Sequence, residues 1–356
     1  MNLSLELPKN LIINSAGSHL YKIGLSLFPF GSQRRYKYHN PLFIFVLNTT
    51  LIIKWIISSL ITDDQYDIHL LIGDYFYFMD VNARHHLNLA AIFYGLTSLV
   101  SYVLHFYYYK RDIKPTYLRP FEMMAGMVSP QDIGLKDGKC IIELLNRSRS
   151  LFRFSKILSK LFAMCSVIFT SEILFSQQSI FQLLFLSIPW QILLGMFVYF
   201  AANDIIYQIV YFYIICQYLK IKIKSFNKSL LNVINSKKRC NIKYMIQTLH
   251  EILSEIMEFN NNFWSMFLSL FTVIIITVTN MILYFVLFSK TILIYKIGLF
   301  LQFIELKLVF FVLLLSSSSV YSENFKTYKV LNKLYIHQIN VKMRVSLRFK
   351  VTIYCL

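Results

Sequence analysis

The sequence predicts an all-α fold, a polytopic transmembrane helical bundle in which six spans are visible. Of its 356 residues, 56% are hydrophobic and only 15% are charged, whereas soluble domains carry roughly 25% charged residues. Glycine and proline, the usual residues of turns, number only 10 and 7. The five cysteines are too few over this length for a disulfide scaffold, and the apolar content excludes a disordered chain.

The first two predicted spans are separate apolar runs. Each is long enough to cross about 30 Å of hydrocarbon at about 1.5 Å per residue. Residues 41–61 contain Lys54 as their only charged residue, and residues 86–109 contain no lysine, arginine or carboxylate. Residues 1–40 are left as an N-terminal segment ahead of the bundle.

The remaining spans follow from one very long apolar run and two ordinary ones. Residues 161–219 contain only Glu172 and Asp204 as charged residues and are too long for one span. A polar stretch at 176–179 and Pro189 divide this run in two. The third to sixth spans are therefore predicted at 157–178, 188–219, 263–289 and 297–320. The bundle then occupies 41–320 and leaves 321–356 as a C-terminal segment.

Lysine and arginine are distributed very unevenly between alternate loops. The segments 1–40, 110–156, 220–262 and 321–356 together contain thirty of them, and the intervening loops contain three, Arg84, Lys290 and Lys296. Because cytoplasmic loops collect positive charge, we expect both ends of the chain in the cytoplasm. The net charge of +18 is then loop charge facing anionic lipid head groups, which argues against nucleic acid as a partner.

Two segments outside the predicted spans are expected to be helical. Residues 212–234 change from an apolar to a basic pattern without a break, so the fourth helix is predicted to continue into the cytoplasm. In 242–262, apolar residues recur at helical spacing. These two helices form either a surface for subunit assembly or a solvated hairpin. Residues 121–146, which contain Pro130, Gly134 and Gly138, are expected to form a loop.

No motif in the sequence carries catalytic chemistry. There is no phosphate-binding glycine loop, no HExxH zinc motif, no nucleophile elbow and no paired CxxC motif. His85 and His86 are adjacent, so they cannot share one helix face as metal-binding histidines at i and i+4 do. The sequence therefore predicts neither an enzyme nor a cofactor or metal site.

Polar and aromatic residues inside the spans predict a ligand site instead, because such polar groups usually face the bundle interior or a water-filled cavity. The candidates, all in the predicted outer half, are His86, Glu172, Trp190, Asn280, Tyr284, Gln302 and Glu305. Aromatic walls with a few polar groups suit a small molecule. Alternatively, Trp190 belongs to an interfacial aromatic belt, and Glu305 pairs with Lys307 or snorkels. Lys54 and Asp204 are assigned to packing or snorkelling.

Two stretches of the chain carry a family resemblance. YFYIICQYLKIKIKSFNKSLLNVI at 211–234 has a tyrosine-rich apolar run that passes into a basic one, and LHEILSEIMEFNNNFWSMFLSLF at 249–271 enters the fifth span. Both resemble the corresponding segments of the arthropod gustatory receptor family, within the insect-type gustatory and odorant chemoreceptor superfamily. The cytoplasmic N-terminus, the long inner extension and the short outer loops are also similar to that family's layout.

The C-terminal end departs from the family's pattern. The family's seventh helix lines the pore and carries a Thr-Tyr pair, an apolar run and then Gln-Phe. Here Thr327 and Tyr328 are followed by Lys329 and Lys333, and residues 351–356 form at most the start of another span. We expect this chain to be either incomplete or divergent at that end.

The resemblance implies a gustatory (taste) receptor of the plasma membrane. It would be a subunit of a non-selective cation channel that a small extracellular tastant opens, and it would assemble in the lipid bilayer as a homo- or hetero-tetramer with related receptor subunits. A seven-span G-protein-coupled-type receptor is an alternative, although it requires an extracellular N-terminus. A secondary transporter, often built from internal repeats, and a structural or accessory membrane protein are the others.

Overall fold

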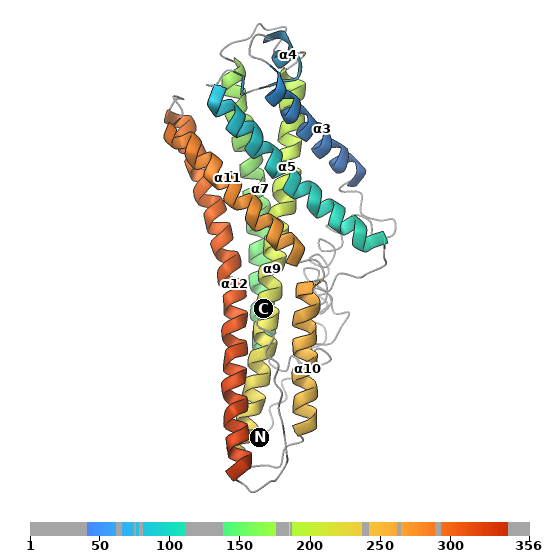
Figure 1. The fold of residues 1–356 in the computed structure, drawn as a ribbon, viewed down its shortest axis with the longest axis vertical. Coiled ribbons are helices and arrows are strands. Elements are labelled where there is room, and N and C mark those ends of the chain that lie inside the picture. The colour runs from blue at the N-terminus through green and yellow to red at the C-terminus, as the bar shows by residue number, and fades with distance from the viewer. Residues whose placement is uncertain are drawn as a thin grey trace.

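The computed structural model describes residues 41–61, 66–74, 76–77, 81–110, 138–175, 185, 187–236, 242–261, 265–288 and 293–340. Within these residues the regular secondary structure is entirely helical and forms an elongated bundle (Figure 1). The helices are α3 (Pro41–Leu60), α4 (Tyr66–Leu71), α5 (Val81–Lys110), α7 (Gly138–Phe175), α9 (Ile188–Ser236), α10 (Ile242–Phe259), α11 (Ser265–Phe288) and α12 (Leu293–Asn340).

Among the described residues, five helices are long and apolar enough to cross a membrane. The qualifying stretches are Phe43–Leu60 in α3, Arg84–Val103 in α5, Ile188–Asn235 in α9, Ser265–Phe288 in α11 and Leu299–Lys333 in α12. The predicted class, an all-helical bundle with several spans, is therefore confirmed. Helix α7 covers the predicted third span, 157–178, as far as Phe175. The number of spans and their orientation stay predictions.

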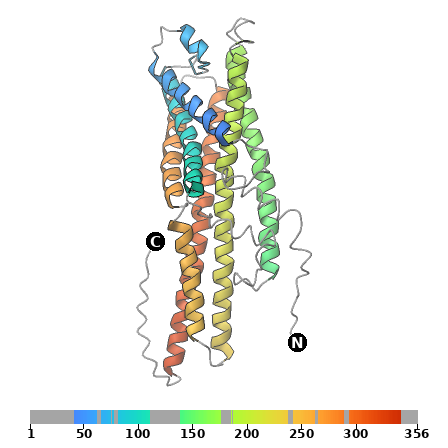
Figure 2. The same ribbon diagram turned by 90° about the vertical axis from the view of Figure 1, so that its right-hand side faces the viewer.

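Helix α9 is the central element and runs for 49 residues without a break. Figures 1 and 2 show α7 and α12 extending beside it along the long axis, and both helices contact it. At about 1.5 Å per residue α9 is about 74 Å long, more than twice the thickness of the hydrocarbon layer. The helix confirms the predicted continuation beyond the fourth span. Pro189 stands in its first turn, where a missing N–H breaks no helical hydrogen bond.

Two helices are longer than the sequence patterns indicated. Residues 138–146, expected to belong to a loop, form the first turns of α7, so this part of the prediction is wrong. Gly138 begins the helix, and the pair Glu143 and Arg147, four residues apart, supports it. Helix α12 continues through Val320 to Asn340. Its serines satisfy their hydroxyls within the helix, as Ser316 Oγ does by donating to Val312 O at 2.6 Å.

Small side chains allow α7 to pack closely on α9. Ser148, Ser155 and Ser159 lie seven and four residues apart, which places them on one helix face, and all three are almost fully buried. Each hydroxyl donates to the carbonyl four residues earlier, so none is left unsatisfied in the interface. Close approach through small residues is the usual way in which helices associate in membranes.

The bundle has two ends, which are formed by different helices. One end, called the α4 end here, carries α4 with the adjoining parts of α3, α5, α9 and α11 (Figure 1). Towards the other end, called the α10 end, α10 packs against α9, and the lower half of α12 runs beside them (Figure 2). Most of the predicted ligand-site residues belong to helices that reach the α4 end.

Candidate functional site

His86 and Tyr284, both predicted from the sequence, meet in the structure. Helices α5 and α11 pack together, and the two rings stack with their centroids 4.6 Å apart and their planes 17° apart. Tyr284 also contacts Phe288 at 4.8 Å. Because Tyr284 is 47% exposed, this aromatic group lies at the edge of the bundle rather than in its interior.

Trp190, at the start of α9, holds the segment after α4 in place. Its Nε1 donates to Leu71 O at 3.0 Å, and its ring packs directly against Gly73. Lys54 Nζ, from α3, lies 4.7 Å from the centre of the Trp190 ring. The indole therefore joins three parts of the α4 end, through a hydrogen bond, a steric contact and a cation–π contact.

The other predicted residues are not brought together among the described residues. Asn280 is exposed on α11, and Gln302 is half-buried on α12. Glu172 lies on α7 and Glu305 on α12, but their side chains lie outside the description. A single pocket formed by all seven residues therefore stays a prediction.

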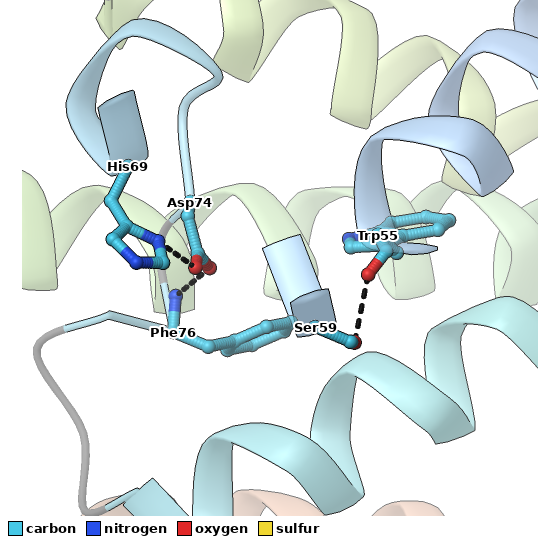
Figure 3. Close-up of polar contacts among 5 residues, drawn as sticks. All are labelled: Trp55, Ser59, His69, Asp74 and Phe76. Atoms are coloured by element: carbon cyan, nitrogen blue, oxygen red, sulfur yellow. Dashed lines mark hydrogen bonds and ion pairs between the residues drawn. The ribbon is translucent and has the colours of Figure 1, made fainter. Parts of the chain in front are cut away.

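A buried His–Asp pair, which the sequence analysis did not identify, closes the α4 end (Figure 3). His69 Nδ1 and Asp74 Oδ2 lie 2.9 Å apart, and both side chains are almost fully buried. Asp74 Oδ1 accepts a hydrogen bond from Phe76 N at 3.1 Å, and Asp74 N donates to His69 O at 2.9 Å. We call residues 66–77, as far as they are described, the cap. The available signal was a histidine and an aspartate flanking Gly73 between apolar residues.

Two further side chains fix the cap to the bundle. Tyr77 stacks on His69 with 4.5 Å between ring centroids, and the Arg84 guanidinium of α5 lies 5.7 Å from the centre of the Tyr77 ring. Arg84 is only 2% exposed. The cap thus has a buried centre at His69, Gly73 and Asp74, whereas Ile68 and Leu71 are exposed.

Below the cap, α3 and α5 enclose polar groups that lack partners. Asn48 Nδ2 donates to Ser98 Oγ at 3.1 Å, and a Cβ on Gly95 would lie 2.8 Å from Ile52 Cγ1. Two helices that pair in this antiparallel register place Ser58 level with Asn88, nearer the α4 end. Both residues are fully buried, and neither the Ser58 hydroxyl nor the Asn88 amide has a hydrogen-bond partner among the described residues.

Next to Ser58 along α3, an apolar and aromatic cluster lies between α3 and α9. One turn away, Trp55 packs edge-on against Phe197 at 5.1 Å. Leu51 and Leu194 belong to the same buried cluster as Trp55 and Phe197, and Tyr94 packs on it. Apolar and aromatic side chains beside a few unpaired polar groups are the usual composition of a small-molecule site. This pair is therefore the candidate binding site.

Comparison with known proteins found no match to this chain. No protein-family model, no curated protein and no solved structure matches this chain. Within the described part of the chain, no group of three or more His, Cys, Asp or Glu residues could hold a metal ion.

Proposed function

We propose that this chain is a chemoreceptor subunit of the gustatory type, part of a cation channel that a small tastant opens. The α4 end would face the extracellular side of the plasma membrane, in keeping with the few basic residues in the predicted outer loops. The observation that carries the proposal is the Ser58/Asn88 pair, buried without partners inside an apolar bundle.

Unpaired buried groups of this kind favour a ligand. A buried hydroxyl or amide without a partner costs on the order of 1–3 kcal/mol. A small molecule that carries hydroxyl or amide groups would recover this free energy by bonding to Ser58 and Asn88. The surrounding rings of Trp55 and Phe197 would cover its apolar surface. A tastant with both polar and apolar faces therefore fits this site.

Opening of a channel would require the tastant to bind one state of the pore better than the other. Helix α5 connects the candidate site to the rest of the bundle, because it packs against α3, α9 and α11. A shift of α5 on ligand binding would change all three contacts. In the proposed assembly, related subunits complete the pore within the lipid bilayer.

A secondary transporter is the second candidate function. Asp204 favours it, because this acidic residue is buried in α9, and carboxylates at such positions often serve ion-coupled transport. The two functions differ in what crosses the membrane. A channel passes an ion current that the ligand gates, whereas a transporter moves the ligand itself.

The test expresses the chain in cultured cells, alone and with related receptor subunits, and applies a panel of sugars, amino acids and alkaloids. We expect at least one compound to evoke a cation current. Asn88→Leu, which keeps the branched shape and the number of side-chain heavy atoms but removes the amide, should raise the half-maximal concentration at least about tenfold, or about 1.4 kcal/mol. Glu305→Ala should also shift the response without loss of surface expression.

The matched control is Asn146→Leu, which makes the same change at an exposed position of α7. It should leave the response unchanged. An equal response of wild type and Asn88→Leu would exclude the Ser58/Asn88 pair as the binding site. Uptake of a compound without any evoked current would identify a transporter and overturn the channel proposal.

A further inference from the structure

Asp204 is a buried acidic residue on α9 with incomplete bonding. It is 4% exposed and lies in a helix that is apolar enough to span a membrane. Ser101 Oγ, from α5, donates to Asp204 Oδ1 at 3.2 Å. Gln208, one turn further along α9, donates from Nε2 to the same Ser101 Oγ at 3.3 Å. The three side chains form one polar cluster between α5 and α9.

The charge of this cluster is not balanced by the protein. Among the described residues, no lysine, arginine or histidine forms an ion pair with Asp204. The second carboxylate oxygen, Oδ2, is buried and accepts no hydrogen bond from that part of the chain. Burial of an unpaired carboxylate is very costly, so a proton or a cation must neutralise it.

A bound proton would leave more unmade hydrogen bonds in this cluster than a bound cation would. Protonation at Oδ2 would create an O–H donor with no acceptor among the described residues, and such a donor carries its own cost. Protonation at Oδ1 would displace the hydrogen that Ser101 donates there and would still leave Oδ2 without a hydrogen bond. A cation, in contrast, binds directly to a carboxylate oxygen and draws on the lone pairs of neighbouring oxygens. The Ser101 hydroxyl supplies one such oxygen, and the Gln208 amide supplies another after rotation about its terminal bond.

The ligand set indicates which cation would fit. Carboxylate, hydroxyl and amide oxygens are hard ligands, which suit alkali and alkaline-earth ions rather than transition metals. A single carboxylate balances one positive charge, and a divalent ion would leave an excess buried charge. We propose that Asp204, Ser101 and Gln208 form a binding site for a monovalent alkali cation such as Na⁺.

This site is separate from the Ser58/Asn88 pair and does not depend on the proposed receptor function. Asp204 lies sixteen residues into α9, about 24 Å from its first residue at about 1.5 Å per residue. Ser101 lies thirteen residues beyond Asn88 on α5, about 20 Å by the same measure. A cation here would join α5 to α9 whether or not a tastant is bound.

The test uses the purified full chain in detergent and needs no tastant. Thermal unfolding is measured at constant pH and ionic strength in about 150 mM NaCl, KCl or N-methyl-D-glucamine chloride. A ligand that binds only the folded state raises its midpoint in a concentration-dependent way. We expect Na⁺ to raise the midpoint by several degrees over the organic cation. Asp204→Asn should abolish this difference, and Ser101→Ala should reduce it.

Glu255→Gln is the matched control, because Glu255 is equally buried but has Lys222 and Tyr218 as partners. It should lower the midpoint by the same amount in every salt. Identical wild-type midpoints in all three salts would overturn the proposal. So would a dependence on pH without any dependence on Na⁺, which would identify a proton at Asp204. If Asp204→Asn does not fold, sodium NMR line broadening, compared between wild type and Ser101→Ala, replaces it.

Discussion

Trp190 and Gly73 are matched in shape, because the indole occupies the space that any side chain at position 73 would need. A Cβ on Gly73 would lie 2.5 Å from Trp190 Cγ and 2.9 Å from Trp190 Cβ. Gly73 also has a φ of +65°, in the left-handed region that glycine adopts readily. Two residues 117 positions apart in the sequence therefore determine together how the cap seats on the bundle.

Gly73→Ala should displace the cap. The added methyl group meets the least mobile atoms of Trp190 and also strains the backbone, so we expect a loss of about 1–3 kcal/mol. Thermal unfolding measures the loss, and limited proteolysis reports exposure of 66–77. In Gly73→Ala with Trp190→Ala the steric part should disappear, so the two effects should not add. Simple additivity would show that the contact is unimportant.

Trp190→Phe should loosen the cap without unfolding the bundle. Phenylalanine retains a ring beneath Gly73 and Lys54 but cannot donate to Leu71 O, and one lost hydrogen bond is worth about 1 kcal/mol. Hydrogen exchange in the cap should quicken while that of α9 stays unchanged. In the cellular assay, Trp190→Ala should shift the dose–response curve with normal surface expression. An unchanged dose–response curve would show that the cap does not affect how the ligand reaches its site.

Composition and apolar runs were sufficient to predict the membrane-type helices, because helices of at least eighteen residues dominate the described part of the chain. They did not predict that α7 begins at Gly138 or that α12 continues to Asn340. Residue contacts were less predictable. The sequence placed His86 and Tyr284 in the same half of the bundle, and they do stack. It did not identify His69 with Asp74, because six residues of α4 and a turn give no periodic pattern. Nor could it place Ser58 level with Asn88, which follows from the register of α3 against α5.

Ser159→Leu should disrupt the packing of α7 against α9. Ser159 is fully buried on the small-residue face, and a larger side chain would force the helices apart, at a cost of about 1–3 kcal/mol. Ser159→Ala should be nearly neutral, because it loses only a hydrogen bond within the helix. Ser150→Leu, on an exposed face of α7, is the matched control. Equal thermal midpoints for the two leucine variants would contradict the packing argument.

Lys222→Met should release α10 from α9. Lys222 Nζ pairs with Glu255 Oε2, and Tyr218 OH donates to Glu255 Oε1 at 3.0 Å, so the carboxylate is fully engaged while 4% exposed. Without the lysine, a nearly buried charge remains, and breaking such a pair costs about 3–5 kcal/mol. Hydrogen exchange along 242–259 should rise sharply, with little change in α7.

The double variant Lys222→Met with Glu255→Leu distinguishes the pair from the surrounding packing. It removes both charges, so the penalty for an isolated buried carboxylate disappears, and the apolar neighbours Ile223, Leu230 and Ile252 remain. Protection of the α10 amides from hydrogen exchange should return towards the wild-type value. If the double variant exchanged as fast as Lys222→Met alone, the ion pair itself, rather than burial of apolar surface, would hold α10 in place.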